Sequence, residues 1–226
     1  MFLSKLTPDV RSPLVRRDLA LAYQLHRTLW RAFPAGDPGR VLFRVEEARA
    51  GGQPAVLVQS DRVPDWSVLP KEYLAAPAEY KPLVVDVSAG RLLRFRLRAN
   101  PTRLVGNVLR VERLAGAKRT GHRVAILKEE DQVAWLERKG AEGGFALPAR
   151  VLTLPDGTGI RKPRVDVTPE GWVRCDKDGH EGARFLAVRF DGVLKVTDPV
   201  RFRQTLSDGV GPAKGFGFGL LSVASA

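Results

Sequence analysis

The sequence of 226 residues contains a single cysteine, Cys175, and only three histidines. One cysteine cannot form a disulfide within the chain, which favours a reducing cytoplasm as the location of the protein. One cysteine and three histidines also cannot supply a convincing zinc site. We therefore expect no metal and no small-molecule cofactor.

Long apolar segments are missing as well. No stretch approaches the roughly 18 consecutive apolar residues of a transmembrane helix, so the sequence predicts no membrane partner. The first ten residues include Lys5 and Asp9 and lack a long apolar core, which indicates a strand and not a signal peptide. Blocks of about five or six like charges, typical of disordered basic arms, are also missing.

Positive charge, in contrast, is abundant and evenly spread. The formal net charge is +12 and the pI is about 10.4. Residues 1–100 contain 16 lysines and arginines against 10 acidic residues, and residues 101–226 contain 21 against 15, so each part carries +6. This balance favours a folded cationic surface in both halves and a polyanionic partner, with nucleic acid ahead of an anionic membrane.

The pattern of apolar residues, turns and caps predicts a mixture of strands and helices. Predicted strands cover residues 2–7, 41–46, 55–59, 91–98 and 220–223, with a strand-rich stretch over 151–196. Predicted helices cover residues 13–33, 129–140 and 199–207, and residues 99–123 are expected to form a basic loop. Within the strand-rich stretch, Asp178-Gly179 and Asp191-Gly192 indicate hairpin turns.

Each half of the chain roughly follows the order strand, helix, strands, helix, strand. This order predicts an α+β protein of two tandem ferredoxin-like domains, each a sheet with helices on one face. We place the first domain at residues 1–100 and the second at residues 101–226. No close sequence repeat relates the two halves.

The first predicted helix brings together two candidate catalytic side chains. His26 and Tyr23 are three residues apart, so they are neighbours on the helix surface. They lie where an apolar stripe meets an arginine-rich side of the helix. The arginines of that side are Arg16, Arg17, Arg27 and Arg31. Such a boundary would partly desolvate an imidazole and a phenol beside a phosphate-binding surface.

This pair suits the cleavage of RNA by its own 2′-hydroxyl, helped by a general base and a general acid. His26 suits either role because the unperturbed pKa of histidine is about 6.5. Tyr23 could donate a proton, or act as a base where cations lower its pKa. Arg27 or Lys214 could offset charge on the reacting phosphorus. The alternative is that His26 and Tyr23 are purely structural.

A glycine-rich segment at residues 209–219 is a second candidate site. Glycines let a backbone approach phosphates closely and expose its N–H groups. The segment is not a P-loop, because the Gly-Lys-Ser/Thr ending is missing, and not a dinucleotide motif, because a strand follows it. Its candidate RNA-binding residues are Gly209, Gly211, Lys214, Gly215 and Gly217. The alternative is a tight connection made of small residues.

Three arginines, Arg94, Arg96 and Arg98, alternate along the strand predicted at residues 91–98. Residues two apart share one face of a strand, so these side chains form a cationic stripe. The stripe could contact an RNA backbone, or it could be a solvated face of the sheet. On the first interpretation, the three arginines join Arg27 and Arg31 in an RNA-binding surface.

Several motifs follow one another along the whole chain, from Arg17-Asp-Leu-Ala-Leu-Ala-Tyr23-Gln-Leu-His26 to Gly209-Val-Gly-Pro-Ala-Lys-Gly-Phe-Gly. The others lie at residues 64–69, 95–101, 121–124, 133–138 and 143–145. As a set they resemble the CasE family of CRISPR endoribonucleases. The resemblance implies tandem ferredoxin-like domains and cleavage of the repeat hairpin in CRISPR precursor RNA. It also implies that the enzyme retains the mature crRNA and joins protein subunits in the Cascade complex.

The resemblance also assigns residues. It maps the active-site histidine of the family onto His26 and its tyrosine onto Tyr23, and the glycine-rich loop onto residues 209–219. The hairpin that approaches the RNA groove maps onto Val173 to Arg184. The expected RNA contacts of this hairpin are Arg174 and Lys177.

The sequence departs from the family in two places. Relatives can have a helix-breaking Asn-Pro just before the tyrosine, but this chain has Leu21-Ala22, so we expect a continuous first helix. Residues 146–172 match poorly, which leaves the RNA contacts of that region unassigned. Two other classes remain compatible with the residues: an RNA-binding subunit without catalysis, and a ferredoxin-like enzyme that acts on a small phosphate ester.

Overall fold

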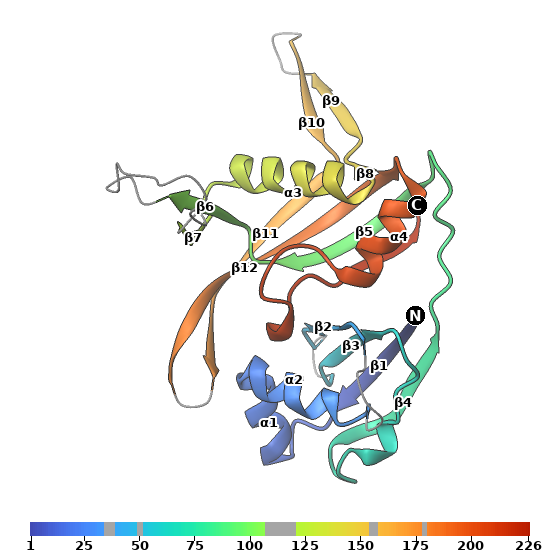
Figure 1. Ribbon diagram of the computed structural model, residues 1–226, viewed down its shortest axis with the longest axis vertical. Helices are drawn as coiled ribbons and strands as arrows, with labels where there is room; N and C mark the ends of the chain where they lie inside the picture. Colours follow the sequence, from blue (N-terminus) through green and yellow to red (C-terminus); the bar gives the residue numbers. More distant parts are fainter. Residues whose placement is uncertain (34–38, 49–51, 107–120, 154–157, 178–179) are drawn as a thin grey trace, which may run out of the picture.

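The computed structural model describes all of the chain except residues 34–38, 49–51, 107–120, 154–157 and 178–179. In some strand residues beside these gaps, only the backbone is described. Two antiparallel sheets, each covered by helices, form the two parts of the molecule (Figure 1). Within the described residues, none of the helices combines the length and apolar character that a membrane crossing requires.

The first sheet contains four strands in the order β2-β3-β1-β4. The strands are β1 (Phe2–Pro8), β2 (Val41–Glu46), β3 (Ala55–Ser60) and β4 (Leu74–Pro82). Helices α1 (Pro13–Ala20) and α2 (Ala22–Trp30) follow β1, and the short 3₁₀ helix η1 (Trp66–Val68) follows β3. The core between sheet and helices contains Leu6, Leu25, Leu29, Phe43, Val58 and Tyr73.

The second sheet has its main strands in the order β11-β12-β5-β13. They are β5 (Leu92–Ala99), β11 (Val165–Lys177), β12 (His180–Val196) and β13 (Leu221–Ser225), with the short β8 (Phe145–Ala146) paired to β12. Helices α3 (Glu129–Gly143) and α4 (Pro199–Asp208) pack against it. Its core contains Leu97, Trp135, Leu136, Phe190, Phe202 and Leu206.

The two sheets share one topology, which confirms the expected fold class. In both, the second and third main strands form a hairpin beside the first, and the fourth lies on the other side of the first. All neighbouring strands are antiparallel. This is the order of a ferredoxin-like unit. In the first unit, η1 stands where the second helix is expected.

The division between the units lies earlier than the predicted residue 100. Strand β5 pairs with β12 from Leu92 to Ala99 and with β13 from Leu93 to Leu97, so it is the first strand of the second sheet. Leu93, Phe95 and Leu97 accordingly lie in the second core. The division therefore falls between Pro82 and Leu92, because an alternating apolar strand belongs to the sheet that buries its apolar face.

Two hairpins lie outside the sheets. The segment expected to be a loop at residues 99–123 contains β6 (Thr102–Gly106) and β7 (Gly121–Ala125), which pair with each other. A second hairpin, β9 (Ala149–Thr153) with β10 (Gly159–Pro163), projects beyond α3 (Figure 1). The loop prediction was therefore wrong at both of its ends.

The predicted hairpin turn at Asp191-Gly192 was also wrong, because β12 runs through it without interruption. Asp191 forms ion pairs with Arg96 at 2.6 Å and with Arg189 at 3.0 Å. A Cβ on Gly192 would collide with the carbonyl oxygen of Arg164. Gly192 therefore serves a close approach of two backbones within the sheet. The other predicted turn, at residues 178–179, lies outside the described residues.

The predicted continuous first helix breaks at Leu21, which has an extended backbone (φ −123°, ψ 91°). Asp18 is fully buried, and its carboxylate accepts hydrogen bonds from Thr28 at 2.6 Å and from Tyr73 at 2.9 Å. In one straight helix, residues 18 and 28 would lie about 15 Å apart along the axis. The contact between Asp18 and Thr28 thus requires the break, without a glycine or proline at that point.

Buried polar contacts join the two units. The Arg44 guanidinium on β2 is 3% exposed, and it donates to the carbonyl oxygen of Leu220 at 3.1 Å and to the Ser222 hydroxyl at 3.1 Å. Gln59 on β3 donates to the carbonyl oxygen of Leu206. These bonds satisfy groups that would be costly to bury unpaired. They hold the end of the chain against the first sheet.

Candidate active site

His26 lies on α2 in a cluster of aromatic rings. Its ring stacks on Phe43 of β2, with 6.2 Å between ring centroids, and meets Trp30 edge-on at 5.3 Å. The Tyr23 ring is 6.5 Å away. Burial among these side chains lowers the pKa of His26 below its ordinary value. A neutral imidazole is therefore the predominant form near neutral pH.

The glycine-rich segment closes the other side of this histidine. A Cβ added at Gly215 would lie 3.8, 3.9 and 4.0 Å from Nε2, Cδ2 and Cε1 of His26, so the bare backbone of the loop packs over the ring face at the Nε2 end. The Phe216 ring lies 6.1 Å from Tyr23. Both loop residues belong to the 3₁₀ helix η2 (Lys214–Phe216). The structure therefore brings His26, Tyr23 and the glycine-rich loop together, as expected for one site.

Positive backbone angles explain several glycines of this loop. Gly209, Gly211 and Gly217 have φ values of 75°, 81° and 79°, which other residues rarely adopt. A Cβ on Gly217 would also approach the Phe43 ring at 3.1 Å. The same Phe43 ring therefore supports both His26 and the loop.

Sequence reasoning missed the aromatic partners of the site. Phe43 belongs to the apolar pattern of a strand, and Phe216 stands among glycines, so neither suggests contact with a histidine. The only sequence signal was that Phe216 and Phe218 interrupt an otherwise small-residue loop. Pairing them with α2 required the tertiary structure.

The candidate cations divide into two groups. Arg27 is exposed on α2, next to His26 in the sequence, and Arg31 is exposed at the C-terminal cap of the same helix. Lys214 instead turns toward α3 and α4, where it lines a cavity with Lys139 and Asp208. Its pKa is lowered by burial and by the nearby charges of Arg40 and Lys139. The two cations predicted to offset charge on a phosphate, Arg27 and Lys214, thus lie on different elements, and the choice between them stays a prediction.

The arginine stripe on β5 is largely neutralised within the protein. Arg96 pairs with Asp191 at 2.6 Å and with Glu46 at 3.1 Å. Arg98 pairs with Glu170 at 2.6 Å and lies over the Phe218 ring, and Arg94 donates to the carbonyl oxygen of Ser225. These contacts favour a structural role for the stripe, with RNA contact through Arg94, Arg96 and Arg98 as an untested prediction.

The expected RNA-groove hairpin is formed by β11 and β12. Arg174 is exposed and lies directly across the pair from Arg184, which stands over the exposed Trp172 ring at 5.8 Å. Two arginines at facing positions give the hairpin a concentrated positive charge. The side chain of Lys177 lies outside the described residues. No group of three or more His, Cys, Asp or Glu that could hold a metal ion occurs where the structure describes side chains.

Removing the buried carboxylate beneath α2 should destabilise the protein. Burial and the carboxylate of Asp18 raise the pKa of Tyr73, which keeps its hydroxyl protonated as a donor. Asp18→Ala leaves the buried hydroxyls of Thr28 and Tyr73 without their acceptor, so we expect a loss of about 2–4 kcal/mol in the free energy of unfolding. Urea unfolding of the parent and of Asp18→Ala measures this loss. Tyr73→Phe should lose only about 1 kcal/mol, and equal stabilities of parent and Asp18→Ala would contradict the role of the network.

Comparison with known proteins places this geometry in a family. A family model described as CRISPR associated protein matches residues 1–225. The chain is 44% identical over 232 residues to the CRISPR-associated endoribonuclease Cse3 of Thermus thermophilus, with 99% of this chain and 100% of the relative covered. It is 34% identical over 211 residues to the CRISPR system Cascade subunit CasE of Escherichia coli, with 92% of each covered.

A solved structure agrees with the sequence relatives. The structure of CRISPR endoribonuclease Cse3 bound to a 19-nucleotide RNA matches with a TM-score of 0.79 and 41% identity, and covers 99% of this chain and 100% of that one. The match includes both ferredoxin-like units, α2 and the glycine-rich loop, since it spans nearly the whole chain. The chain therefore belongs to the CRISPR-associated protein family that contains Cse3 and CasE.

Proposed function

We propose that this chain is a metal-independent endoribonuclease that cuts the repeat hairpin of CRISPR precursor RNA. The observation that carries the proposal is the partly buried His26, which lies beside Tyr23 with the bare backbone of Gly215 packed over its ring. Such a site offers a neutral imidazole held in place for proton transfer. The endoribonuclease activity named for the Thermus relative supports it.

The reaction uses a nucleophile that RNA itself supplies. The 2′-oxygen at the cut site attacks the adjacent phosphorus, and the bond from phosphorus to the 5′-oxygen breaks. One group takes the 2′ proton, and another gives a proton to the leaving oxygen. His26 serves as one of these groups, and Tyr23 either serves as the other or orients the phosphate. Arg27 offsets charge on the five-coordinate phosphorus.

The surroundings of the site hold the RNA and its product. The β11–β12 hairpin, through Arg174 and Lys177, approaches the groove of the repeat stem. Arg27 on α2 and Arg31 at its C-terminal cap contact the backbone of the stem. The protein retains the mature crRNA and joins other subunits of Cascade in the cytoplasm. The name of the Escherichia coli relative, a Cascade subunit, supports this partnership.

Incubation with a repeat hairpin in the presence of EDTA tests the proposal. The upstream product should end in a 2′,3′-cyclic phosphate and the downstream product in a 5′-hydroxyl, because the 2′-oxygen forms the new bond to phosphorus. End-group analysis of both fragments distinguishes this outcome from hydrolysis by water. Tight hairpin binding without any cleavage would replace the proposal with a non-catalytic RNA-binding subunit.

Hairpin affinity should fall steeply with salt. The +12 charge predicts many phosphate contacts, so the logarithm of the binding constant should decrease linearly with the logarithm of salt concentration. Titrations from low to high salt measure the slope.

Arg174→Ala should weaken binding of the RNA hairpin more than binding of an unstructured RNA strand of the same length, because the protein hairpin β11–β12 contacts the groove of an RNA stem. Equal losses on both RNAs would remove that assignment.

A further inference from the structure

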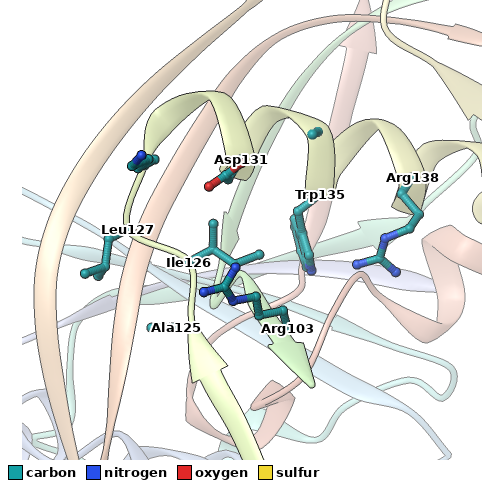
Figure 2. Close-up of a pocket in the computed structure, with 9 residues that line it drawn as sticks. Arg103, Ala125, Ile126, Leu127, Asp131, Trp135 and Arg138 are labelled. Carbon is teal, nitrogen blue, oxygen red and sulfur yellow. The ribbon is translucent and has the colours of Figure 1, made fainter. Parts of the chain in front are cut away.

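A second basic surface begins at the residue that precedes Gly215. Two cavities, of about 650 and 700 Å³, lie under α3 and share Arg103, Trp135 and Arg138 as lining residues. Figure 2 shows Trp135 between Arg103, from β6, and Arg138, from α3. We call the joined cavities the α3 groove. Its cations are Arg103, Arg123, Lys128, Arg138, Lys139 and Lys214.

The α3 groove has more positive charge than its own carboxylates can balance. Its six cations face three carboxylates, those of Asp131, Glu142 and Asp208, which leaves a difference of +3. Glu142 is shared between Arg138 at 3.2 Å and Lys139 at 2.6 Å. The pKa of Lys214 is lowered mainly by burial, and also by the charges of Arg40 outside the groove and Lys139 within it. The groove therefore suits an anionic ligand.

The α3 groove also offers apolar surface beside its cations. Leu104 and Leu127, which line its two cavities, are 54% and 69% exposed. An RNA duplex presents phosphates and sugars on its outside, whereas an unpaired strand also presents the faces of its bases. A groove with both exposed leucines and cations therefore fits a single strand better than a duplex.

The position of the groove links it to the cut site. Gly215 faces Nε2 of His26, while the preceding residue, Lys214, lines the groove. Consecutive Cα atoms are about 3.8 Å apart, so the glycine-rich loop separates the two sites by little more than its own thickness. Gly209 and Gly211 of the same loop also line the groove. A strand that leaves the cut site can thus enter the groove within a few nucleotides.

We propose that the α3 groove binds an unpaired strand of RNA that continues from the base of the repeat hairpin. The inference rests on the proposed function, because it requires the hairpin to sit at His26. The groove then acts as a second RNA site, which adds affinity for flanked RNA and orients the strand that crosses the catalytic histidine. An acidic protein segment is the competing occupant.

Binding assays with matched RNAs test this inference. A bare hairpin is compared with the same hairpin carrying an unpaired flank at its 5′ end or at its 3′ end, all with a 2′-deoxy nucleotide at the cut site to prevent cleavage. At least one flanked RNA should bind about tenfold more tightly than the bare hairpin, with a steeper salt dependence. Arg103→Glu or Arg123→Glu should abolish this gain and leave bare-hairpin affinity nearly unchanged. Both side chains are exposed, so neither change should unfold the protein.

Arg150→Glu is the matched control, because it makes the same charge change on the exposed β9–β10 hairpin, outside the groove. It should keep the gain from the flank. Equal affinity for flanked and bare RNA, or a gain that survives both groove variants, would overturn the inference. Binding of a polyglutamate peptide to the parent but not to Arg103→Glu, without any gain from a flank, would assign the groove to a protein partner instead. Cleavage of the bare hairpin is scored separately, so failure of the endoribonuclease proposal remains distinguishable.

Discussion

His26→Ala should lower the rate of hairpin cleavage by about 10²- to 10⁴-fold, the usual contribution of a positioned acid or base. The ring lies between Phe43 and the backbone of Gly215, and its removal takes away the imidazole that carries the proton. Single-turnover cleavage in EDTA, with protein in excess over RNA, measures the chemical step. Tyr23→Phe keeps the ring and removes only the hydroxyl, so its loss should be smaller if the phenol only orients the phosphate.

RNA binding separates a catalytic effect from a structural one. His26→Ala should bind the hairpin nearly as tightly as the parent, because an uncharged ring adds little to a phosphate-dominated interface. A 2′-deoxy nucleotide at the cut site should block cleavage by the parent, because the nucleophile is missing, and should leave binding nearly intact. Cleavage by His26→Ala at the parental rate would end the catalytic assignment of this residue and leave an RNA-binding protein.

The pH profile of the parent should reveal which proton His26 moves. Burial lowers the pKa of His26, so the midpoint of its titration should lie below the ordinary value of about 6.5. If His26 is the base, it must be neutral, and the rate should rise with pH through that midpoint and then level off. If it is the acid, it must be protonated, and the rate should fall through the same midpoint.

Gly215→Val should reduce cleavage by about 10²-fold, the order expected when reacting groups are displaced by roughly 1 Å. A Cβ at this position would lie 3.8 Å from Nε2 of His26, and the methyl groups of valine would press against the imidazole ring and displace it. Unlike Gly209, Gly211 and Gly217, Gly215 does not have a positive φ, so a side chain here adds no backbone strain of that kind. Single-turnover rates and thermal melting are measured together.

Gly215→Ala provides the matched control. Its Cβ would meet the imidazole at an ordinary van der Waals distance, so the variant should retain most of the activity. The ratio between the alanine and valine variants therefore reports how closely the loop packs on the imidazole ring. Equal activity in both would mean that the loop does not hold His26 in its reactive position.

Local signals in the sequence predicted the elements whose ends are set locally. The strand at residues 41–46 has the predicted bounds, and Asp198 caps α4 by accepting from the N–H groups of Val200 and Arg201. A cap and an alternating pattern act within a few residues, so they are visible in the sequence. The order of these elements was enough to predict the tandem ferredoxin-like fold.

Long-range contacts decided what the sequence did not reveal. The break at Leu21 depends on Asp18 reaching Thr28 and Tyr73, and nothing at Leu21 itself signals it. The straight course of β12 through Asp191 depends on an ion pair with Arg96 of another strand. Likewise, His26 and Tyr23 were identified from their helix, but the Phe43 and Phe216 rings that enclose them come from distant segments.

The closure of the His26 site by Gly215 has a consequence for the protein during its synthesis. The two residues are 189 positions apart in the chain (215 − 26), so α2 leaves the ribosome long before its partner loop. At about 5–20 residues per second, this interval lasts about 10–40 s. Until then the first unit lacks the loop that packs on His26. The site is therefore completed only near the end of synthesis, after almost the whole chain has been made.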